Sequence, residues 1–368
     1  MDDRECMAQA LALGALAEGS NSPNPRVGCL LVRHGQIVGR GFHAAPGCPH
    51  AEACAVDQAG ERARGATVFV NLEPCAHHGR TPPCADLLIR SGVDRVLAAL
   101  QDPNPLVNGR GFERLRQAGI AVQVGLLAEE ARRLNESFLH WHMQGRPLVT
   151  LKAALSLDGL LSAAGGRSRW ITGEVARRFA HRLRLRHDAV LVGAETVRRD
   201  DPRLTVRLPR VQALRLRAVL SGTVELDPAA KLFQRNAAAE PLTRIYTAQP
   251  VGEKRRSLWA GRAELVGVPA ARNGLDLGAV LADLGRLGAQ SVLVEGGGRT
   301  HAAFLEAGLA DRAALFQSGA LLGARGARPF LDMPAVDEPA QGWRLEPRHH
   351  FFLGSDRLML GRLVRPGG

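Results

Sequence analysis

Short apolar runs rich in branched residues alternate with amphipathic stretches from Val27 to about Leu139. Period-two alternation favours strands, whereas apolar residues spaced three to four apart favour helices. We predict strands at 28–32, 37–42, 67–72, 95–100 and 121–124. We predict helices that end near Glu18 or begin near His50, Pro82, Gly109 and Leu127. With a hairpin turned at His34-Gly35, this order predicts a layered α/β sheet with its functional loops at one edge.

The alternation resumes after a break at Gln144-Gly145-Arg146-Pro147. Glycine and proline end the preceding helix near His142, and a branched run begins at once. We predict strands near 148–154, 189–192, 217–220, 244–246, 291–294 and 313–316, and helices near 173–186, 277–287 and 300–307. A chain of 368 residues exceeds one typical core. We therefore predict two domains, 1–145 and 146–368.

Charge and composition narrow the class of protein. The formal net charge is +12, but among 48 basic residues only Lys152, Lys231 and Lys254 are lysines. The arginines are spread along the chain, and aromatic residues make up only 4%. No basic run is interleaved with the stacking residues that single-strand binding uses. We therefore expect a solvated basic surface and no nucleic-acid partner.

The N-terminus and the cysteines bear on location. No window approaches the roughly 18 to 20 apolar residues that span a bilayer, and Met1-Asp2-Asp3 is acidic where a secretory signal is basic. All six cysteines lie between Cys6 and Cys84. That clustering suits a metal site in a reducing compartment better than a disulfide framework. We expect a cytoplasmic protein with no membrane partner.

Candidate metal ligands and a candidate proton-transfer group lie in His50-Ala51-Glu52, Glu73-Pro74-Cys75 and Cys84. One imidazole and two thiols can bind Zn²⁺ and leave the fourth tetrahedral position to water, as in catalytic zinc sites. A carboxylate off the metal can move protons while an amine is hydrolysed from a heterocycle. We predict that His50, Cys75 and Cys84 bind zinc and that Glu52 is catalytic. The alternative is a core histidine, two buried cysteines and a surface glutamate.

The spacing of these residues is consistent with one site. Residues two apart in mid-helix point roughly 200° apart, so His50 and Glu52 converge only in a first turn. We predict a helix over 50–64, a strand that delivers Cys75, and a helix N-terminus at Cys84, whose dipole would lower the thiol pKa. Cys48 and Cys54 are either spare ligands or small apolar fillers.

The residues alone do not decide the role of three features in the second half. Glu295-Gly296-Gly297-Gly298 lies between a strand and a helix, and forms either a phosphate cradle or a tight turn. Lys152 on a buried strand is either functional or a lysine that reaches solvent at the strand end. Asp200-Asp201-Pro202 and Arg207 are typical of a solvated loop.

These motifs resemble the bifunctional deaminase/reductase family of riboflavin biosynthesis over almost the full chain. In the first half the resemblance rests on Pro23-Asn24-Pro25-Arg26-Val27-Gly28, the zinc motifs and Gln101-Asp102-Pro103-Asn104-Pro105. Eight residues separate Cys75 from Cys84, where cytidine and tRNA adenosine deaminases usually have two. In the second half the resemblance runs through Leu151-Lys152, Ser156-Leu157-Asp158-Gly159, 168–172, 188–193, Thr196, 200–207 and Val294-Glu295-Gly296-Gly297.

The resemblance implies a fold and two successive reactions. It implies a cytidine-deaminase-like α/β/α domain over 1–145 and a dihydrofolate-reductase-like α/β domain over 146–368. The first would hydrolyse the 2-amino group of 2,5-diamino-6-(5-phosphoribosylamino)pyrimidin-4-one. The second would use NADPH to reduce the ribosyl group of 5-amino-6-(5-phosphoribosylamino)uracil to ribityl. The resemblance also implies phosphoribosylaminopyrimidine substrates and a homo-oligomer, either a dimer or a tetramer.

Matching positions carry the family's binding residues. The pyrimidine and its phosphate are expected at Asn24, His43, Arg80 and Asn104. NADPH is expected at Lys152, Ala154, Trp170, Thr196, Asp200, Ser221, Gly297, Gly298, Arg299, Thr300, His301, Ala302 and Ala303. The ribosyl substrate of the reductase is expected at Ser168, Arg184, Leu204, Arg207 and Glu295.

Two departures from the family pattern keep other readings open. Leu220 stands where the family usually has aspartate, and Gly319-Ala320 replace a Pro-Lys pair. One alternative is therefore a deaminase with a decayed reductase domain. Another is a tRNA or DNA deaminase, which the wide thiol spacing and the large second domain oppose.

Overall fold

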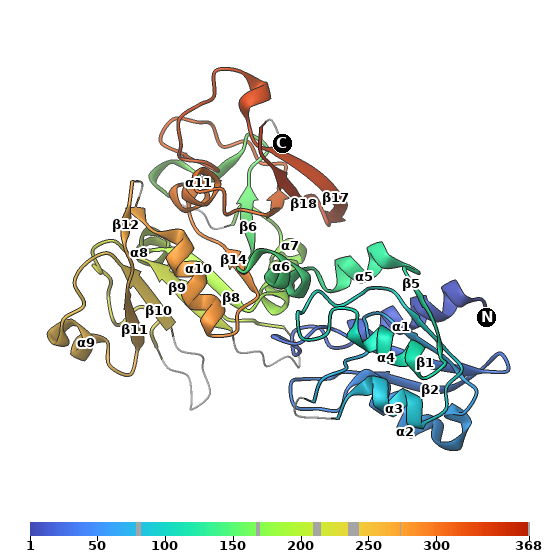
Figure 1. The fold of residues 1–368 in the computed structure, drawn as a ribbon. Helices are drawn as coiled ribbons and strands as arrows, with labels where there is room; N and C mark the ends of the chain where they lie inside the picture. Colours follow the sequence, from blue (N-terminus) through green and yellow to red (C-terminus); the bar gives the residue numbers. More distant parts are fainter. Residues whose placement is uncertain (79–81, 167–169, 209–214, 235–242, 273, 367–368) are drawn as a thin grey trace. The chain divides into compact units, whose positions relative to one another are not determined.

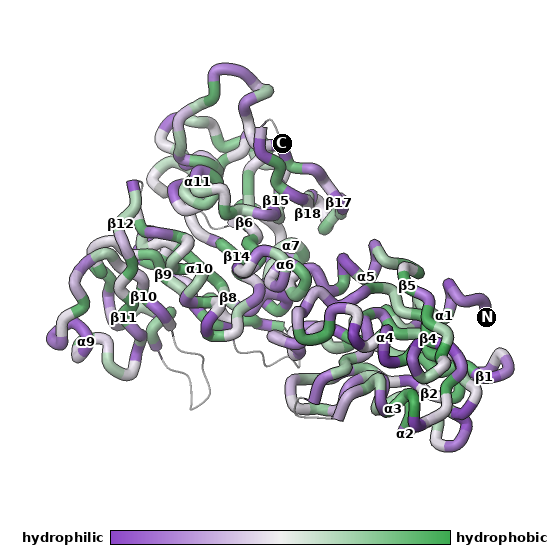
Figure 2. Tube along the Cα trace, viewed as in Figure 1, coloured by the Kyte–Doolittle hydropathy of each residue, from purple (hydrophilic) through white to green (hydrophobic). Residues whose placement is uncertain are grey.

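The computed structural model of the chain describes residues 1–78, 82–166, 170–208, 215–234, 243–272 and 274–366 (Figure 1). The chain divides into two compact units, Met1–Arg146 and Pro147–Gly368. Figure 2 shows hydrophobic residues along the strands of each unit, as expected for sheets covered by helices. None of the helices in the described ranges is long and apolar enough to cross a membrane.

The first unit is built on a five-stranded sheet with the order β2-β1-β3-β4-β5. Its strands are β1 (Gly28–Arg33), β2 (Gln36–Phe42), β3 (Thr67–Val70), β4 (Arg95–Ala98) and β5 (Ala121–Val124). β1 is antiparallel to β2 and β3, and β3, β4 and β5 are parallel. All five predicted strands are present. β3 and β4 end two residues earlier than predicted, and residues 71–72 and 99–100 are buried just beyond them.

Helices cover both faces of this sheet. They are α1 (Asp3–Ala15), α2 (Ala51–Ala59), α3 (Cys84–Arg90), α4 (Arg110–Gln117), α5 (Ala128–Leu134) and α6 (Glu136–Gln144), with a 3₁₀ turn at Gly60–Ala63. α2, α3 and α4 share one apolar cluster with the strands, and α1, α5 and α6 share the other. The predicted α/β/α layering is therefore confirmed. The helix predicted over 50–64 is shorter than expected and ends at Ala59, where Gly60 adopts a positive φ of 54°.

Two glycines set the depth at which α2 packs on β2. A Cβ atom added at Gly39 would lie 2.1 Å from the Ala55 carbonyl oxygen, and one at Gly41 would lie 2.1 Å from that of Ala51. No larger residue fits there without moving the helix. Because α2 begins directly after His50, these contacts also place the first turn that carries the predicted chemistry.

The second unit is built on a nine-stranded sheet with the order β11-β10-β9-β8-β14-β6-β15-β18-β17. Its strands are β6 (Leu148–Leu155), β8 (Ala189–Gly193), β9 (Leu216–Leu220), β10 (Thr243–Thr247), β11 (Ala263–Gly267), β14 (Ser291–Val294), β15 (Arg312–Gln317), β17 (Arg344–Leu353) and β18 (Asp356–Val364). The strands from β11 to β15 are parallel, and β18 and β17 follow in antiparallel pairing.

Helices also cover both faces of the larger sheet. They are α7 (Glu174–Arg186), α8 (Ala194–Asp200), α9 (Glu253–Trp259), α10 (Leu277–Arg286) and α11 (Gly298–Glu306). α10 and α11 pack on one face, and α7, α8 and α9 pack on the other. The short strands are β7 (Leu160–Ser162), β12 (Ala270–Ala271), β13 (Gly274–Leu275) and β16 (Arg328–Pro329), and 3₁₀ turns lie at Ala164–Gly166 and Pro339–Gln341.

The pattern missed several elements of the second unit. The six predicted strands and three predicted helices are present, but β11, β17, β18, α8 and α9 were not anticipated. β17 is exposed along almost its whole length at the edge of the sheet, so it lacks the buried alternation that identifies a strand. α8 spans seven residues, which is too short for a clear helical period. Asp200 ends this helix instead of lying in a loop.

We predict that Gly41→Ala impairs the first unit selectively. The added methyl group pushes α2 outward, so zinc content and the deamination expected from the sequence should fall at least tenfold. The reduction expected of the second unit should be unchanged. Metal analysis and ammonia release measure the effect. Gly252→Ala is the control, because a Cβ there meets nothing within 4 Å and its φ is −80°. Full zinc occupancy in Gly41→Ala would show that the close approach is not required.

Candidate active sites

Three predicted ligands converge in the first unit. The ligand atoms of His50, Cys75 and Cys84 all lie within 4.8 Å of one another. His50 Nδ1 is 3.3 Å from Cys84 Sγ and 3.6 Å from Cys75 Sγ. A tetrahedral zinc with ordinary bond lengths needs S···N separations of about 3.6 Å. The donor set and its spacing therefore fit a zinc ion with one open position.

The three predicted ligands come from different segments, and two of them lie at helix N-termini. His50 is the N-cap of α2 in extended conformation, and Glu52 lies in the first turn of that helix. Cys75 follows β3, and Cys84 is the first residue of α3. The first turn is the only helical geometry that allows residues two apart to face the same site, which is the arrangement predicted from the spacing.

Glu52 is enclosed beside the ligand cluster. Its exposed fraction is 3%. Burial, aided by the charge of Cys75, raises the pKa of Glu52 to about 7. A carboxyl group with a pKa near neutrality can both accept and return a proton.

The two thiols are not equivalent. The prediction that the helix N-terminus lowers the pKa of the Cys84 thiol is wrong. The Cys84 N–H at the start of α3 donates to Cys75 Sγ at 3.3 Å. That amide therefore stabilises the neighbouring sulfur instead of its own side chain. The pKa of Cys75 is lowered to about 4, chiefly by the Cys84 side chain and then by His50. The pKa of Cys84 is raised, because it shares a proton with Cys75 and is buried.

Two of the predicted pyrimidine-binding residues are connected to this cluster. His43 packs edge-on against His50 with ring centroids 5.3 Å apart. Its Nε2 is 2.9 Å from the Asn24 side-chain amide, and its Nδ1 is 3.1 Å from the Pro49 carbonyl oxygen. Asn104 lies in the loop before α4, with its side-chain oxygen bonded to Leu106 N–H. Arg80 lies outside the described residues.

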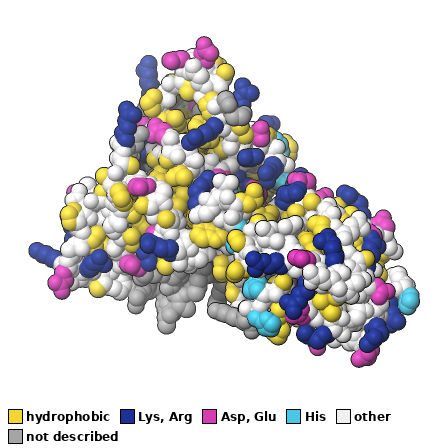
Figure 3. Space-filling model, in the orientation of Figure 1, with side chains coloured by type: hydrophobic (Ala, Val, Ile, Leu, Met, Phe, Trp, Pro, Cys, Tyr) yellow, Lys and Arg dark blue, Asp and Glu magenta, His cyan; other side chains and the backbone are white. Residues whose placement is uncertain are grey.

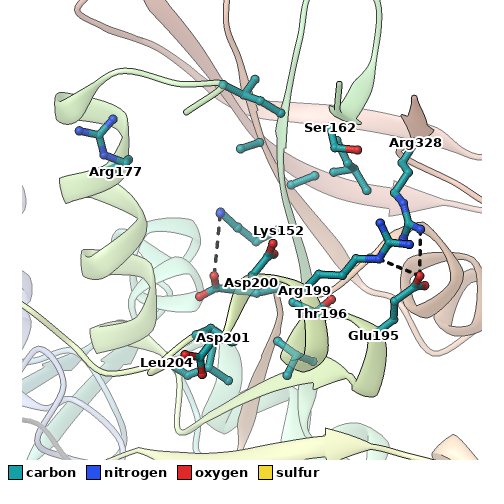
Figure 4. A pocket seen from close by; sticks show the side chains of 18 of the residues that line it. Lys152, Ser162, Arg177, Glu195, Thr196, Arg199, Asp200, Asp201, Leu204 and Arg328 are labelled. Carbon is teal, nitrogen blue, oxygen red and sulfur yellow. Dashed lines mark ion pairs between the residues drawn. The ribbon is translucent and has the colours of Figure 1, made fainter. Parts of the chain in front are cut away.

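The second unit holds a cleft made of two adjoining pockets of about 560 Å³ and 660 Å³. Both pockets are lined by Glu195, Thr196, Gly297, Gly298 and Arg328. Figure 4 shows the first of them, with Glu195 between Arg199 and Arg328. A cleft with two lobes is suited to an extended ligand such as a dinucleotide.

Most predicted reductase residues line this cleft. The first pocket is lined by Lys152, Ala154, Trp170, Thr196, Asp200, Arg184, Leu204, Arg207, Glu295, Gly297, Gly298 and His301. The second adds Arg299, Thr300 and Ala303. Ser221 and Ala302 are buried and line neither pocket, although Leu220 and Gly222 beside Ser221 line the second. Ser168 lies outside the described residues.

The geometry of the glycines after β14 is consistent with the predicted phosphate cradle. A Cβ atom at Gly296 would lie 2.8 Å from Val192 Cα, and one at Gly298 would lie 2.8 Å from the Pro329 carbonyl oxygen. Gly297 has a positive φ of 57° and forms the N-cap of α11. The loop therefore brings bare backbone and a helix N-terminus to the wall of the cleft, where a phosphate or ribose of NADPH can approach closely.

A buried charge cluster lies at one end of the cleft. Arg184 donates to both carboxylate oxygens of Glu295, at 2.5 and 2.9 Å, and Lys152 Nζ lies 3.8 Å from that carboxylate. Although burial opposes it, the charge of Arg184 holds the pKa of Glu295 at about 2. Arg184 also donates to the Thr205 carbonyl oxygen, which ties this cluster to the segment of Leu204 and Arg207. Lys152 therefore ends in a charge cluster that faces the cleft.

No role was predicted from the sequence for His181 or Glu73, because the groups that surround each of them include residues from distant parts of the chain. His181 on α7 receives the Arg207 backbone N–H at 3.3 Å, and burial with the charges of Arg184 and Arg207 lowers its pKa to about 4. Glu73 is buried beside Cys75 and accepts several backbone N–H groups. Its place in the Glu73-Pro74-Cys75 motif was the available signal.

We predict that Glu295→Gln lowers the free energy of unfolding of the second unit near neutral pH by roughly 3 kcal/mol. That energy corresponds to the lowering of the Glu295 pKa from 4.5 to about 2. The folded pKa lies below the ordinary 4.5, so the carboxylate stabilises fully above that pH. This contribution is lost as pH falls toward about 2. Hydrogen exchange of β14 amides should show the wild-type advantage shrinking across this window. A pH-independent difference would contradict the charge pairing.

Comparisons with known proteins match both units. A family model described as the cytidine and deoxycytidylate deaminase zinc-binding region matches residues 1–100, and one described as the RibD C-terminal domain matches residues 147–359. The riboflavin biosynthesis protein RibD of Aquifex aeolicus (strain VF5) is 43% identical over 321 residues, covering 87% of this chain and 88% of that protein.

Two solved structures are similar over nearly the whole chain. Acinetobacter baumannii RibD, form 1, has a TM-score of 0.89 at 35% identity and covers 99% of both chains. The diaminohydroxyphosphoribosylaminopyrimidine deaminase/5-amino-6-(5-phosphoribosylamino)uracil reductase of Thermotoga maritima has a TM-score of 0.86 at 34% identity and covers 98% of both chains.

Proposed function

The chain belongs to the RibD family of bifunctional riboflavin-biosynthesis deaminase/reductases, and we propose that each unit carries one reaction on the residues located above. The enzyme has deaminase and reductase activities, with zinc and NADPH as cofactors. The first unit hydrolyses the 2-amino group of 2,5-diamino-6-(5-phosphoribosylamino)pyrimidin-4-one. The second reduces the ribosyl group of 5-amino-6-(5-phosphoribosylamino)uracil to ribityl. The observation that carries the proposal is the convergence of His50, Cys75 and Cys84 beside buried Glu52.

In the first unit, His50, Cys75 and Cys84 hold the metal. Zinc, when bound, supplies a water molecule that is acidic enough to deliver hydroxide near neutral pH. Glu52 accepts the proton of the attacking water and donates a proton to the departing ammonia. Enclosure of Glu52 keeps bulk water from exchanging that proton before the amine leaves. His50 and Cys84 lie at helix N-termini, and Cys75 accepts the Cys84 N–H, so the site is preorganised.

Asn24, His43 and Asn104 hold the pyrimidine in this proposal, and Arg80 in the wide loop holds its phosphate. The contact of His43 with both Asn24 and His50 supports the first part. A guanidinium suits a phosphomonoester because its paired donors match two phosphate oxygens.

In the second unit, the glycine loop and Thr196 hold NADPH along the cleft, with Lys152, Ala154, Trp170, Asp200 and Ser221 as further cofactor residues. NADPH supplies the hydride for the C1 carbon of the ring-opened sugar. Ser168, Arg184, Leu204, Arg207 and Glu295 hold the ribosyl substrate. The cluster of Glu295 with Arg184 supports this end of the cleft as the substrate end, because it fixes Arg184 and the segment that carries Arg207.

The two departures from the family pattern leave the cleft formed. Leu220 ends β9 and lines the second pocket. The segment at Gly319-Ala320 is held by bonds from Ala320 N–H to Ser318 Oγ and from Leu157 N–H to the Ala320 carbonyl oxygen. Asp158 accepts the N–H groups of Leu322 and Gly323. These contacts favour a working reductase over a decayed one.

We further propose a cytoplasmic homo-oligomer without a nucleic-acid partner. The free state of all six cysteines supports a reducing compartment. Figure 3 shows basic and acidic side chains interspersed over each unit's visible face, without a single basic stripe. A stripe of that kind is the usual footprint of nucleic-acid binding.

We predict that Glu52→Gln retains zinc but loses deamination by at least 10³-fold, because the amide cannot move a proton. NADPH oxidation with the deaminated substrate should be unchanged and provides the internal control. Metal analysis, ammonia release and absorbance of NADPH measure the three quantities. Loss of zinc from this variant would make Glu52 a ligand and overturn its assigned role.

A further inference from the structure

Glu73 organises the loop that follows β4. Glu73 is 4% exposed, and its carboxylate accepts four backbone N–H groups. Oε2 accepts Asp102 N–H at 3.2 Å and Gly109 N–H at 2.9 Å. A single oxygen atom therefore closes both ends of the loop from Asp102 to Gly109.

The other carboxylate oxygen fixes the helix after that loop. Oε1 accepts Gly111 N–H at 2.9 Å and Phe112 N–H at 3.3 Å, in the first turn of α4. A negative charge is favourable at a helix N-terminus, where unpaired amides and the dipole converge. Gly111 permits the approach, because a Cβ there would lie 1.9 Å from the Pro74 carbonyl oxygen. The backbone of α4 thus packs directly on the residues that precede Cys75.

Asn104 lies inside the closed loop. Its backbone N–H donates to Asp102 Oδ1 at 2.8 Å, and its carbonyl oxygen accepts Val107 and Asn108 N–H. The position of Asn104 therefore depends on Asp102, which in turn is bonded to Glu73. Cys75 follows Glu73 by two residues, so one short segment carries both a zinc ligand and the clamp on this loop.

We propose that Glu73 is a positioning residue for deamination, which holds Asn104 in register with the zinc ligands by clamping the Asp102–Gly109 loop and α4 to the end of β3. This inference rests on the proposed role of Asn104 in binding the pyrimidine. The proposed action of Glu73 is through the loop and not through contact with the substrate or the metal. An amide at this position keeps the size of the side chain but replaces one acceptor oxygen with an NH₂ group that faces backbone donors.

The test compares Glu73→Gln, Asn104→Ala and the double variant in the full-length, zinc-loaded enzyme. We expect Glu73→Gln to raise KM of the deaminase at least tenfold, with kcat within about threefold, one zinc per chain and unchanged reductase rates. Glu73→Asp, with its shorter reach, should fall between. Glu113→Gln is the matched control, because it removes a charge from an exposed position in the first turn of the same helix.

The double variant decides between a positioning and a general structural role. If Glu73 acts through Asn104, adding Glu73→Gln to Asn104→Ala should raise KM little further. Additive effects, an unchanged KM in either single variant, or loss of zinc from Glu73→Gln would each overturn the inference while leaving wild-type deamination intact. A wild type that releases no ammonia would instead reject the proposed function and this inference together.

Discussion

The first site depends on the close packing of α2 against the β1–β2 hairpin. Gly39 and Gly41 let the helix backbone approach the strand, which places the first turn of α2 opposite the ends of β3 and α3. Only that geometry brings His50 and Glu52 to the same side, although they are two residues apart. His50 and Cys84 are fixed at the N-termini of α2 and α3, and Cys75 lies in the segment between β3 and α3. The spacing of the three proposed zinc ligands therefore follows from the packing of the sheet and its helices.

In the second unit, the arrangement of one end of the cleft depends on the buried carboxylate of Glu295. Glu295 is paired with Arg184 and lies near Lys152, so a charge that would be costly alone is stabilised by its partners. The same cluster reaches the segment of Leu204, whose positive φ of 53° is unusual for a branched residue. Strain of this kind persists where surrounding contacts determine the backbone, and here those contacts line the cleft.

The predictions from the sequence were right where residue types or hydrophobic periodicity identified a site or an element locally. The five strands of the first sheet and six of the nine strands of the second followed from periodicity. The convergence of His50, Cys75 and Cys84 followed from ligand types. The predictions failed for β17, whose exposed edge position removes the alternation, and for α8, which is too short. They also assigned the helix-end amide to the wrong thiol: Cys84 N–H points to Cys75, which no spacing rule reveals. Glu73 and His181 were missed because backbone donors from distant segments define their surroundings.

We propose that one chain performs both reactions in sequence. A coupled assay tests this: the zinc-loaded enzyme receives 2,5-diamino-6-(5-phosphoribosylamino)pyrimidin-4-one and NADPH, and ammonia and NADPH absorbance are followed together. We expect ammonia release first, followed by oxidation of one NADPH per ammonia. Ammonia release without NADPH oxidation would contradict the bifunctional assignment.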